Sequence, residues 1–237
     1  GLYQYLEQNG EIVFKTGVPS GKIPDLGTFF MKNITLSLFA FFAFNSVLAQ
    51  FPTIEIGDRV PFQTYEMRNV DGSTESIETI AGENGALVIF TCNSCPFVVG
   101  RGNKIEGWEG RYNGIIELAA SNGIGSILVN SNSAKRTGDD NVSAMKNRAR
   151  DMEYAAPYVV DEESKLANGF GAKTTPHVFL FNGDLDLIYK GAIDDNVDRA
   201  EEVEEHYLIH AIERHAAGKR VRKNSTAPHG CSIKRVK

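Results

Sequence analysis

Two cysteines separated by two residues are the part of the sequence with the clearest capacity for chemistry. Cys92 and Cys95 lie in the stretch FTCNSCPFV, directly after the apolar run Ala86–Phe90 and directly before Pro96. A pair at this spacing can form a reversible disulfide, can supply half of a metal site, or can act as a structural cross-link. Which of these it does depends on the elements that position the two sulfurs.

The flanking pattern predicts that the pair lies where a buried strand meets a helix. The run Ala86–Phe90 is apolar throughout and is bounded by turn residues, which is typical of a central strand. A cysteine at the start of the next helix faces unpaired N–H groups and the positive end of the helix dipole, so its thiolate is stabilised. The pattern therefore favours redox chemistry, in which Cys92 attacks a disulfide and Cys95 resolves the mixed disulfide.

The rest of the sequence predicts which strands and helices surround this strand and helix. Further strands are expected over 62–67, over 125–132 and shortly after Ala156, and helices within 95–121, over 141–153 and before Gly171. The chain then predicts a hairpin over 177–191 and a last helix over 201–217, whose glutamates would form an acidic first turn. This order predicts an α/β fold with a mixed central sheet flanked by helices and with a C-terminal hairpin and helix.

The beginning of the chain has a different character. Met31 opens MKNITLSLFAFFAFNSVLAQ, in which one lysine precedes an apolar run that ends in small residues. This is typical of a secretory signal peptide and is shorter than the roughly 20 apolar residues of a membrane span. We expect a read-through or non-native extension over 1–30, a signal peptide over 31–49, a redox domain over 50–217 and a basic tail over 218–237. The expected location is the periplasm or the outside of the cell, where disulfides persist, with no stable membrane span after signal cleavage.

Net charge and cysteine content argue against two classes of protein, the nucleic-acid binders and the disulfide scaffolds. The 237 residues carry a formal net charge of -5, which argues against a nucleic-acid binder. Three cysteines are too few for a disulfide scaffold, so any redox chemistry concentrates on them. We expect no cofactor and no bound metal, and as partners we expect thiol or disulfide proteins, or small thiols, together with a redox partner that supplies or removes electrons.

The cysteine pair, together with Thr175-Pro176 and the expected strand order, resembles the thioredoxin fold. More narrowly, the segments FTCNSCPFV, KTTPHVFLF, GAIDDN and HGCSIKRV resemble exported bacterial thioredoxin-like redoxins, the group with alkyl hydroperoxide reductase and thiol-specific antioxidant domains. The resemblance runs from about Ile56 to the C-terminus. It implies a thiol–disulfide oxidoreductase of the antioxidant or redoxin type.

The resemblance also implies a role for each matching residue. Cys92 would be the exposed nucleophile and Cys95 the resolving thiol. Pro176 would be a cis-proline facing the disulfide, which the weak trans preference of X–Pro bonds permits. Thr175 would offer its backbone to an extended thiol substrate, as in strand addition.

Some positions depart from the patterns of related families. Thioredoxin has a buried carboxylate six residues before its first cysteine, and Ala86 stands at that position. Peroxiredoxins have a proline seven residues before their peroxidatic cysteine, and Gly85 and Val88 stand at the two corresponding positions. The second departure favours a dithiol exchanger over a thiol peroxidase.

The cysteine pair is also compatible with a metal site or a structural cross-link. A thioredoxin-fold copper chaperone would use Cys92, Cys95 and His177, with Cys231 as a further soft ligand. Such chaperones usually have three residues between their cysteines, and no second CxxC is present. A purely structural disulfide would close a very short loop and would constrain the unfolded chain little.

The third cysteine lies in the basic tail. Residues 218–237 contain seven lysines and arginines and no acidic residue, a charge pattern that favours a thiolate at Cys231. Our hypothesis is that Cys231 folds back near Cys92 and Cys95 as a third redox thiol or a gate. The competing interpretation is a free or intermolecular thiol in a solvated chain end.

Overall fold

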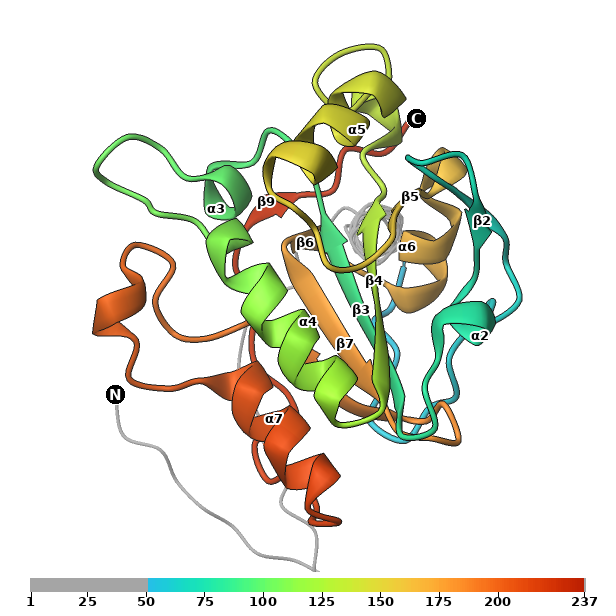
Figure 1. Cartoon of the computed structure of the whole chain (residues 1–237), viewed down its shortest axis with the longest axis vertical. Coiled ribbons are helices and arrows are strands. Elements are labelled where there is room, and N and C mark those ends of the chain that lie inside the picture. The colour runs from blue at the N-terminus through green and yellow to red at the C-terminus, as the bar shows by residue number, and fades with distance from the viewer. Residues whose placement is uncertain (1–50, 237) are drawn as a thin grey trace, which may run out of the picture. The chain divides into compact units, whose positions relative to one another are not determined.

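The computed structural model of the protein describes residues 51–236 (Figure 1). The expected extension over 1–30 and the expected signal peptide over 31–49 lie outside these residues. Within residues 51–236, no helix is both long enough and apolar enough to cross a membrane.

A seven-stranded mixed sheet forms the centre of the domain. Its strand order is β2-β1-β5-β4-β3-β7-β8, in which β3–β4 and β4–β5 are parallel pairs and the other neighbours are antiparallel. The strands are β1 (Met67–Asn69), β2 (Thr74–Glu75), β3 (Gly85–Thr91), β4 (Ile124–Asn130), β5 (Tyr158–Val160), β7 (His177–Phe181) and β8 (Leu187–Gly191). The central strand β3 is buried at every position, as its apolar run predicts.

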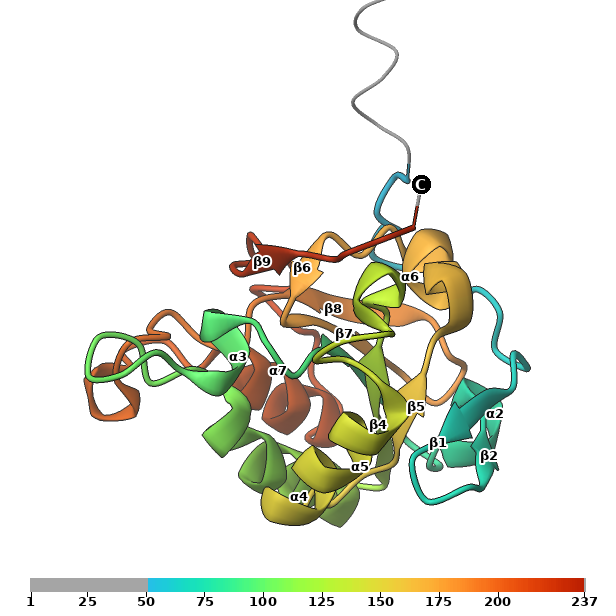
Figure 2. The ribbon, with the colours of Figure 1, turned by 90° about the horizontal axis from the view of Figure 1, so that it is seen from above.

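Helices cover both faces of this sheet (Figures 1 and 2). The helices are α2 (Ile77–Ile80), α3 (Pro96–Val99), α4 (Tyr112–Ser121), α5 (Val142–Asp151), α6 (Lys165–Phe170) and α7 (Tyr207–Ala216). Successive side chains of a strand point to opposite faces. Leu87 and Ile89 of β3 therefore join the core under α4 and α7, whereas Val88 and Phe90 join the core under α2 and α6.

The arrangement is the thioredoxin fold, which confirms the expected fold class. A β3–α4–β4 crossover with parallel strands is followed by the β7–β8 hairpin and by α7. The hairpin is the one that the sequence pattern predicts around residues 182–184. The bond between Thr175 and Pro176, directly before β7, is cis.

The structure corrects two of the expected elements. Residues 201–206 are not α-helical, since α7 begins at Tyr207 after the short 3₁₀ turn η5 (Ala200–Glu202). The amides of Ala200 and Glu204 donate to the side chains of Glu106 and Asp195, and the first turn of α7 contains no acidic residue. The strand expected over 62–67 is mostly a turn, because β1 begins only at Met67.

The long segment that follows the cysteines is broken, as its glycines predict. The four-residue α3 ends at Gly100, and α4 is preceded by a loop and by the 3₁₀ turn η2 (Glu109–Arg111). Gly100 has a φ of 83°, and a Cβ there would lie 2.5 Å from the carbonyl oxygen of Glu106. The sequence therefore ends the first helix where the backbone turns sharply, close to the cysteine pair.

Candidate functional site

The cysteine pair lies at the carboxyl end of β3, where the chain enters α3. Cys92 follows the last residue of the strand, and Cys95 is the N-cap of α3 with φ -78° and ψ 125°. Pro96 occupies the first turn, where its fixed φ suits a helix and its missing N–H is not needed. The strand–CxxC–helix placement predicted from the sequence is therefore present.

Both sulfurs of the pair are covered. Cys92 is 1% exposed and Cys95 is 3% exposed, and both belong to the core under α4 and α7. The expectation of an exposed Cys92 is therefore wrong. Because both sulfurs are buried, a reaction partner can reach them only if the covering segment moves away or takes part in the reaction itself.

Thr175 contacts both sulfurs. Its hydroxyl lies 3.1 Å from the Cys92 sulfur, and its carbonyl oxygen lies 3.1 Å from the Cys95 sulfur. Thr175 belongs to the short strand β6 (Thr174–Thr175) and precedes the cis-peptide bond to Pro176. The structure therefore brings together Cys92, Cys95, Thr175 and Pro176, the four residues that the sequence singled out from separate segments.

Cys231 completes the site from the tail. It opens strand β9 (Cys231–Ser232), which pairs antiparallel with β6 so that Cys231 faces Thr175 (Figures 1 and 2). The amide of Cys231 donates to the Cys95 sulfur at 3.4 Å. The tail does fold back on the pair, in agreement with the hypothesis on its position, and the backbone edge of Thr175 is occupied by the tail.

The three sulfurs differ in how readily they lose a proton. The pKa of Cys95 is lowered from 9.0 to about 5, first by the neighbouring Cys92 thiol and then by Cys231 and the Phe97 amide. The pKa of Cys92 is raised by the neighbouring Cys95 sulfur and by burial. The pKa of Cys231 is raised to about 11 by burial and by the neighbouring Cys95 sulfur. The Thr175 carbonyl accepts a hydrogen bond from the Cys95 thiol and favours its protonated form, whereas the Cys231 amide favours the thiolate.

This proton distribution can be measured in the reduced protein. The thiolate absorbance near 240 nm is expected to fall as the pH drops through about 5, and a Cys95→Ser variant should lack that step. A Cys92→Ala variant removes the neighbouring thiol and should move the step to higher pH. Because a free thiol has a pKa near 9.0, the native state gains stability from Cys95 as pH rises between about 5 and 9, and loses it as pH falls. A step near pH 9 in the wild-type protein would contradict this assignment.

A buried carboxylate that sequence reasoning missed lies beside the pair. Asp140 is fully buried, and it accepts hydrogen bonds from the Asn93 amide at 2.8 Å and from the side chains of Asn130 at 2.8 Å and Asn132 at 3.0 Å. Its charge also contributes to the raised pKa of Cys92. Asp140 lies nearly fifty positions after Cys92, in a segment that reads as a loop before a helix, so no local signal pointed to it.

His177 does not face the sulfurs as a free ligand. Its Nδ1 atom accepts the Lys173 amide at 3.2 Å, and its ring packs on Phe179 with 4.4 Å between ring centroids. Burial lowers the pKa of His177 to about 3, so the ring is neutral at pH 7. Among residues 51–236, no group of three or more histidine, cysteine or acidic side chains is arranged to hold a metal ion. The copper-chaperone interpretation therefore gains no support from the described part of the chain.

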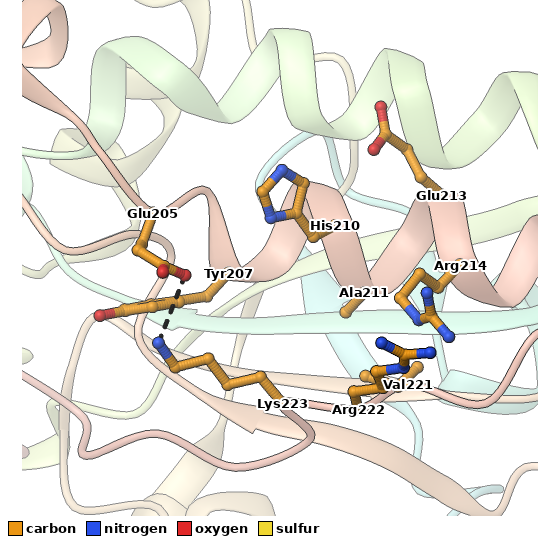
Figure 3. Close-up of a pocket in the computed structure, with 9 residues that line it drawn as sticks. All are labelled: Glu205, Tyr207, His210, Ala211, Glu213, Arg214, Val221, Arg222 and Lys223. Atoms are coloured by element: carbon orange, nitrogen blue, oxygen red, sulfur yellow. Dashed lines mark hydrogen bonds and ion pairs between the residues drawn. The ribbon is translucent and has the colours of Figure 1, made fainter.

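A separate pocket lies beside α7, away from the cysteines (Figure 3). Its lining includes Tyr207, His210, Arg214 and Arg222, together with an ion pair between Lys223 and Glu205 at 3.3 Å. None of the three cysteines and neither residue of the cis-peptide bond lines it. The three cysteines are therefore a better candidate for the reactive site than this pocket.

No family model and no curated protein matches the chain, whereas several solved structures do. An uncharacterized conserved protein from Geobacillus kaustophilus is 25% identical, with a TM-score of 0.67, 76% of this chain covered and 92% of that one. A hypothetical protein from Sinorhizobium meliloti is 24% identical, with a TM-score of 0.69 and 78% and 97% covered. A bacterioferritin comigratory protein from Xanthomonas campestris, described for its alkyl peroxide reduction activity, is 15% identical, with a TM-score of 0.49 and 68% and 99% covered. The first two similarities support the fold and leave the activity to be inferred from the site.

Proposed function

We propose that the protein is a thiol–disulfide oxidoreductase of the redoxin type, whose reactive groups are Cys92 and Cys95. One observation carries the proposal: Thr175 contacts the sulfurs of both Cys92 and Cys95 at 3.1 Å, so both thiols lie against one residue at the junction of β3 and α3. A thiolate is the nucleophile of disulfide exchange, and a second thiol in contact with it can close an intramolecular disulfide.

We propose that Cys95 is the nucleophile and Cys92 the resolving thiol, which is the reverse of the roles that the family resemblance implies. In the proposed reaction the Cys95 thiolate attacks a sulfur of the substrate disulfide, a mixed disulfide forms, and the first substrate thiolate leaves. The neighbouring Cys95 sulfur is the largest cause of the raised pKa of Cys92, and its influence falls once the mixed disulfide removes its negative charge. Cys92 can then lose its proton to the departing thiolate and attack Cys95, which closes the Cys92–Cys95 disulfide and releases the second substrate thiol.

Thr175 is proposed to hold the two sulfurs in register for this step. Its hydroxyl and its carbonyl oxygen contact one sulfur each at 3.1 Å, so a single residue fixes both. The role of its backbone in binding an extended substrate requires that β9 leaves the edge that it occupies in the structure.

The proposal predicts a reversible two-electron couple. The full chain, equilibrated across a series of dithiothreitol redox buffers and trapped with an alkylating reagent, should show Cys92 and Cys95 interconverting together between dithiol and disulfide. The midpoint of this titration gives the reduction potential of the pair, which distinguishes a reductant from an oxidant. A tenfold change in the equilibrium constant corresponds to about 30 mV in that potential. A metal assay on the same sample serves as the control. Cysteines held by metal, or a pair that stays oxidised in strongly reducing buffer, would overturn the proposal.

We further propose that the protein acts in the periplasm or outside the cell. The support is the signal-peptide pattern of residues 31–49, together with the proposed Cys92–Cys95 disulfide, since disulfides persist outside the cytosol. Amino-terminal analysis of the native protein is expected to find Gln50 at or near the start. A native chain that retains residues 31–49 in the cytosolic fraction would contradict this location.

A further inference from the structure

The chain's own tail fills the strand position beside the cis-peptide bond. Strand β9 pairs with β6, with Cys231 opposite Thr175 and Ser232 opposite Thr174. Figure 2 shows β9 lying along β6 at the end of the sheet, close to α3. An extended substrate that paired with Thr175 would need this same edge, so the tail and such a substrate exclude each other.

The tail is built into the fold on the downstream side of Cys231. Ile233 is 5% exposed in the core under α2 and α6, and its amide donates to the carbonyl of Lys173 at 3.1 Å. The amide of Lys234 donates to Asn132 at 2.8 Å, and its carbonyl accepts the amide of Ala134 at 2.8 Å. Arg235 donates to the carbonyl of Ala172 at 2.7 Å. These contacts hold residues 231–235 as a strap across the cysteine pair.

The upstream side of the strap requires a glycine. A Cβ at Gly230 would lie 2.2 Å from the carbonyl oxygen of Thr175 and 3.2 Å from the nitrogen of Pro176. Any other residue would therefore push the strap away from the cis-peptide bond. The preceding His229 places its ring edge-on to Phe97 at 4.7 Å, which fixes the approach of the strap to α3.

The three sulfurs form a series with Cys95 in the middle. Thr175 contacts the sulfurs of Cys92 and Cys95 at 3.1 Å each, and the amide of Cys231 donates to the Cys95 sulfur at 3.4 Å. Cys92 and Cys95 are buried, whereas Cys231 is half-buried and is the most exposed of the three. A central sulfur with two thiol neighbours can form a disulfide with either of them.

We propose that Cys231 is a third redox-active thiol, which exchanges with Cys95 and carries electrons between the buried pair and thiols or disulfides in solution. This inference rests on the proposed function and names the route by which its site is reached. Small thiols, and thiols on flexible segments, are the class of partner that fits, since the strap occupies the edge on which a longer peptide would pair.

The exchange balances without any added oxidant. Starting from the Cys92–Cys95 disulfide, the Cys231 thiolate attacks the Cys95 sulfur, the Cys95–Cys231 bond forms, and the Cys92–Cys95 bond breaks. Cys92 leaves as a thiolate and takes up the proton that Cys231 lost. An outside thiol then attacks the Cys231 sulfur and releases the Cys95 thiolate, and a second outside thiol frees Cys231. Two outside thiols become one disulfide while the protein gains two electrons, and the reverse sequence reduces an outside disulfide.

The test uses the full chain, glutathione as the outside thiol, and disulfide mapping by mass spectrometry. In a Cys92→Ser variant treated with oxidised glutathione, we expect a Cys95–Cys231 disulfide. In a Cys231→Ser variant, we expect the Cys92–Cys95 disulfide to form still, but the rate of exchange with glutathione to fall by about tenfold or more, because the accessible thiol is lost. A Gly230→Ala variant should slow formation of the Cys95–Cys231 disulfide in the Cys92→Ser background. Gly110→Ala is the matched control, since a Cβ there meets nothing within 4 Å.

Two results would overturn the inference. One is a Cys92→Ser variant that carries glutathione on Cys95 or Cys231 but never the Cys95–Cys231 disulfide. The other is a Cys231→Ser variant that exchanges with glutathione at the wild-type rate. A wild-type protein whose Cys92 and Cys95 form no reversible disulfide would instead overturn the proposed function, so the two failures are distinguishable.

Discussion

A Cys95→Ser variant is expected to lose disulfide-exchange activity by about a thousandfold or more, because the thiolate nucleophile is removed. The amide of Cys231 donates to the same sulfur at 3.4 Å, so the loss of this sulfur removes both the Cys92–Cys95 and the Cys95–Cys231 disulfides. The measurement is the rate of reduction of oxidised dithiothreitol or oxidised glutathione by the reduced protein, followed by trapping of the protein thiols.

The matched variant is Cys92→Ser, which keeps Cys95 and its amide donors. This variant should still attack a disulfide through Cys95, and Cys231 should then convert the mixed disulfide into the Cys95–Cys231 disulfide. If instead Cys95→Ser forms the mixed disulfide on Cys92 and Cys92→Ser forms neither product, then Cys92 is the nucleophile, as the family resemblance implies. The two variants together therefore assign the roles whichever way they fall.

An Asp140→Asn variant is expected to lower the free energy of unfolding by about 3 kcal/mol, since a buried carboxylate that accepts three hydrogen bonds is replaced by an amide. The new amide nitrogen would face the side-chain nitrogen of Asn132. Asn132 cannot simply turn its amide over, because its Oδ1 atom already accepts the amide of Lys234 at 2.8 Å. The repulsion between the two amide nitrogens therefore weakens the hydrogen bond between Asn132 and Lys234 of the strap. We expect faster alkylation of Cys231 as a result. Denaturant unfolding and timed alkylation measure the two effects.

The matched control for this prediction is Asp139→Asn. Asp139 is the exposed neighbour of Asp140, and its backbone carbonyl, not its carboxylate, accepts a hydrogen bond from Asn93. This control removes the same charge one residue away and is expected to change the free energy of unfolding by less than about 0.5 kcal/mol. Equal losses in both variants would show that net charge, and not the buried network, is responsible.

Much of the fold could be predicted from local pattern. The buried strand over residues 86–90, the hairpin over 177–191 and the placement of the cysteines after a strand follow from apolar runs, turn residues and the N-cap position. The start of the last helix could not be placed correctly, since the amide of Glu204 donates to the side chain of Asp195 and the amide of Ala200, just before the expected helix, donates to that of Glu106. Tertiary hydrogen bonds override the helical preference of a glutamate run.

The candidate site divides in the same way. The sequence by itself determined that Cys92 and Cys95 lie between a strand and a helix, and that a proline follows Thr175 before an apolar strand, because these depend on short-range pattern. Only the tertiary structure decided that Cys231 contacts Cys95, that Asp140 is buried beside the pair, and that Thr175 contacts both sulfurs. The physical reason is that a thiol's acidity and reach depend on burial and on donors supplied by other segments, and the tail that supplies them pairs with β6 more than fifty residues earlier in the chain.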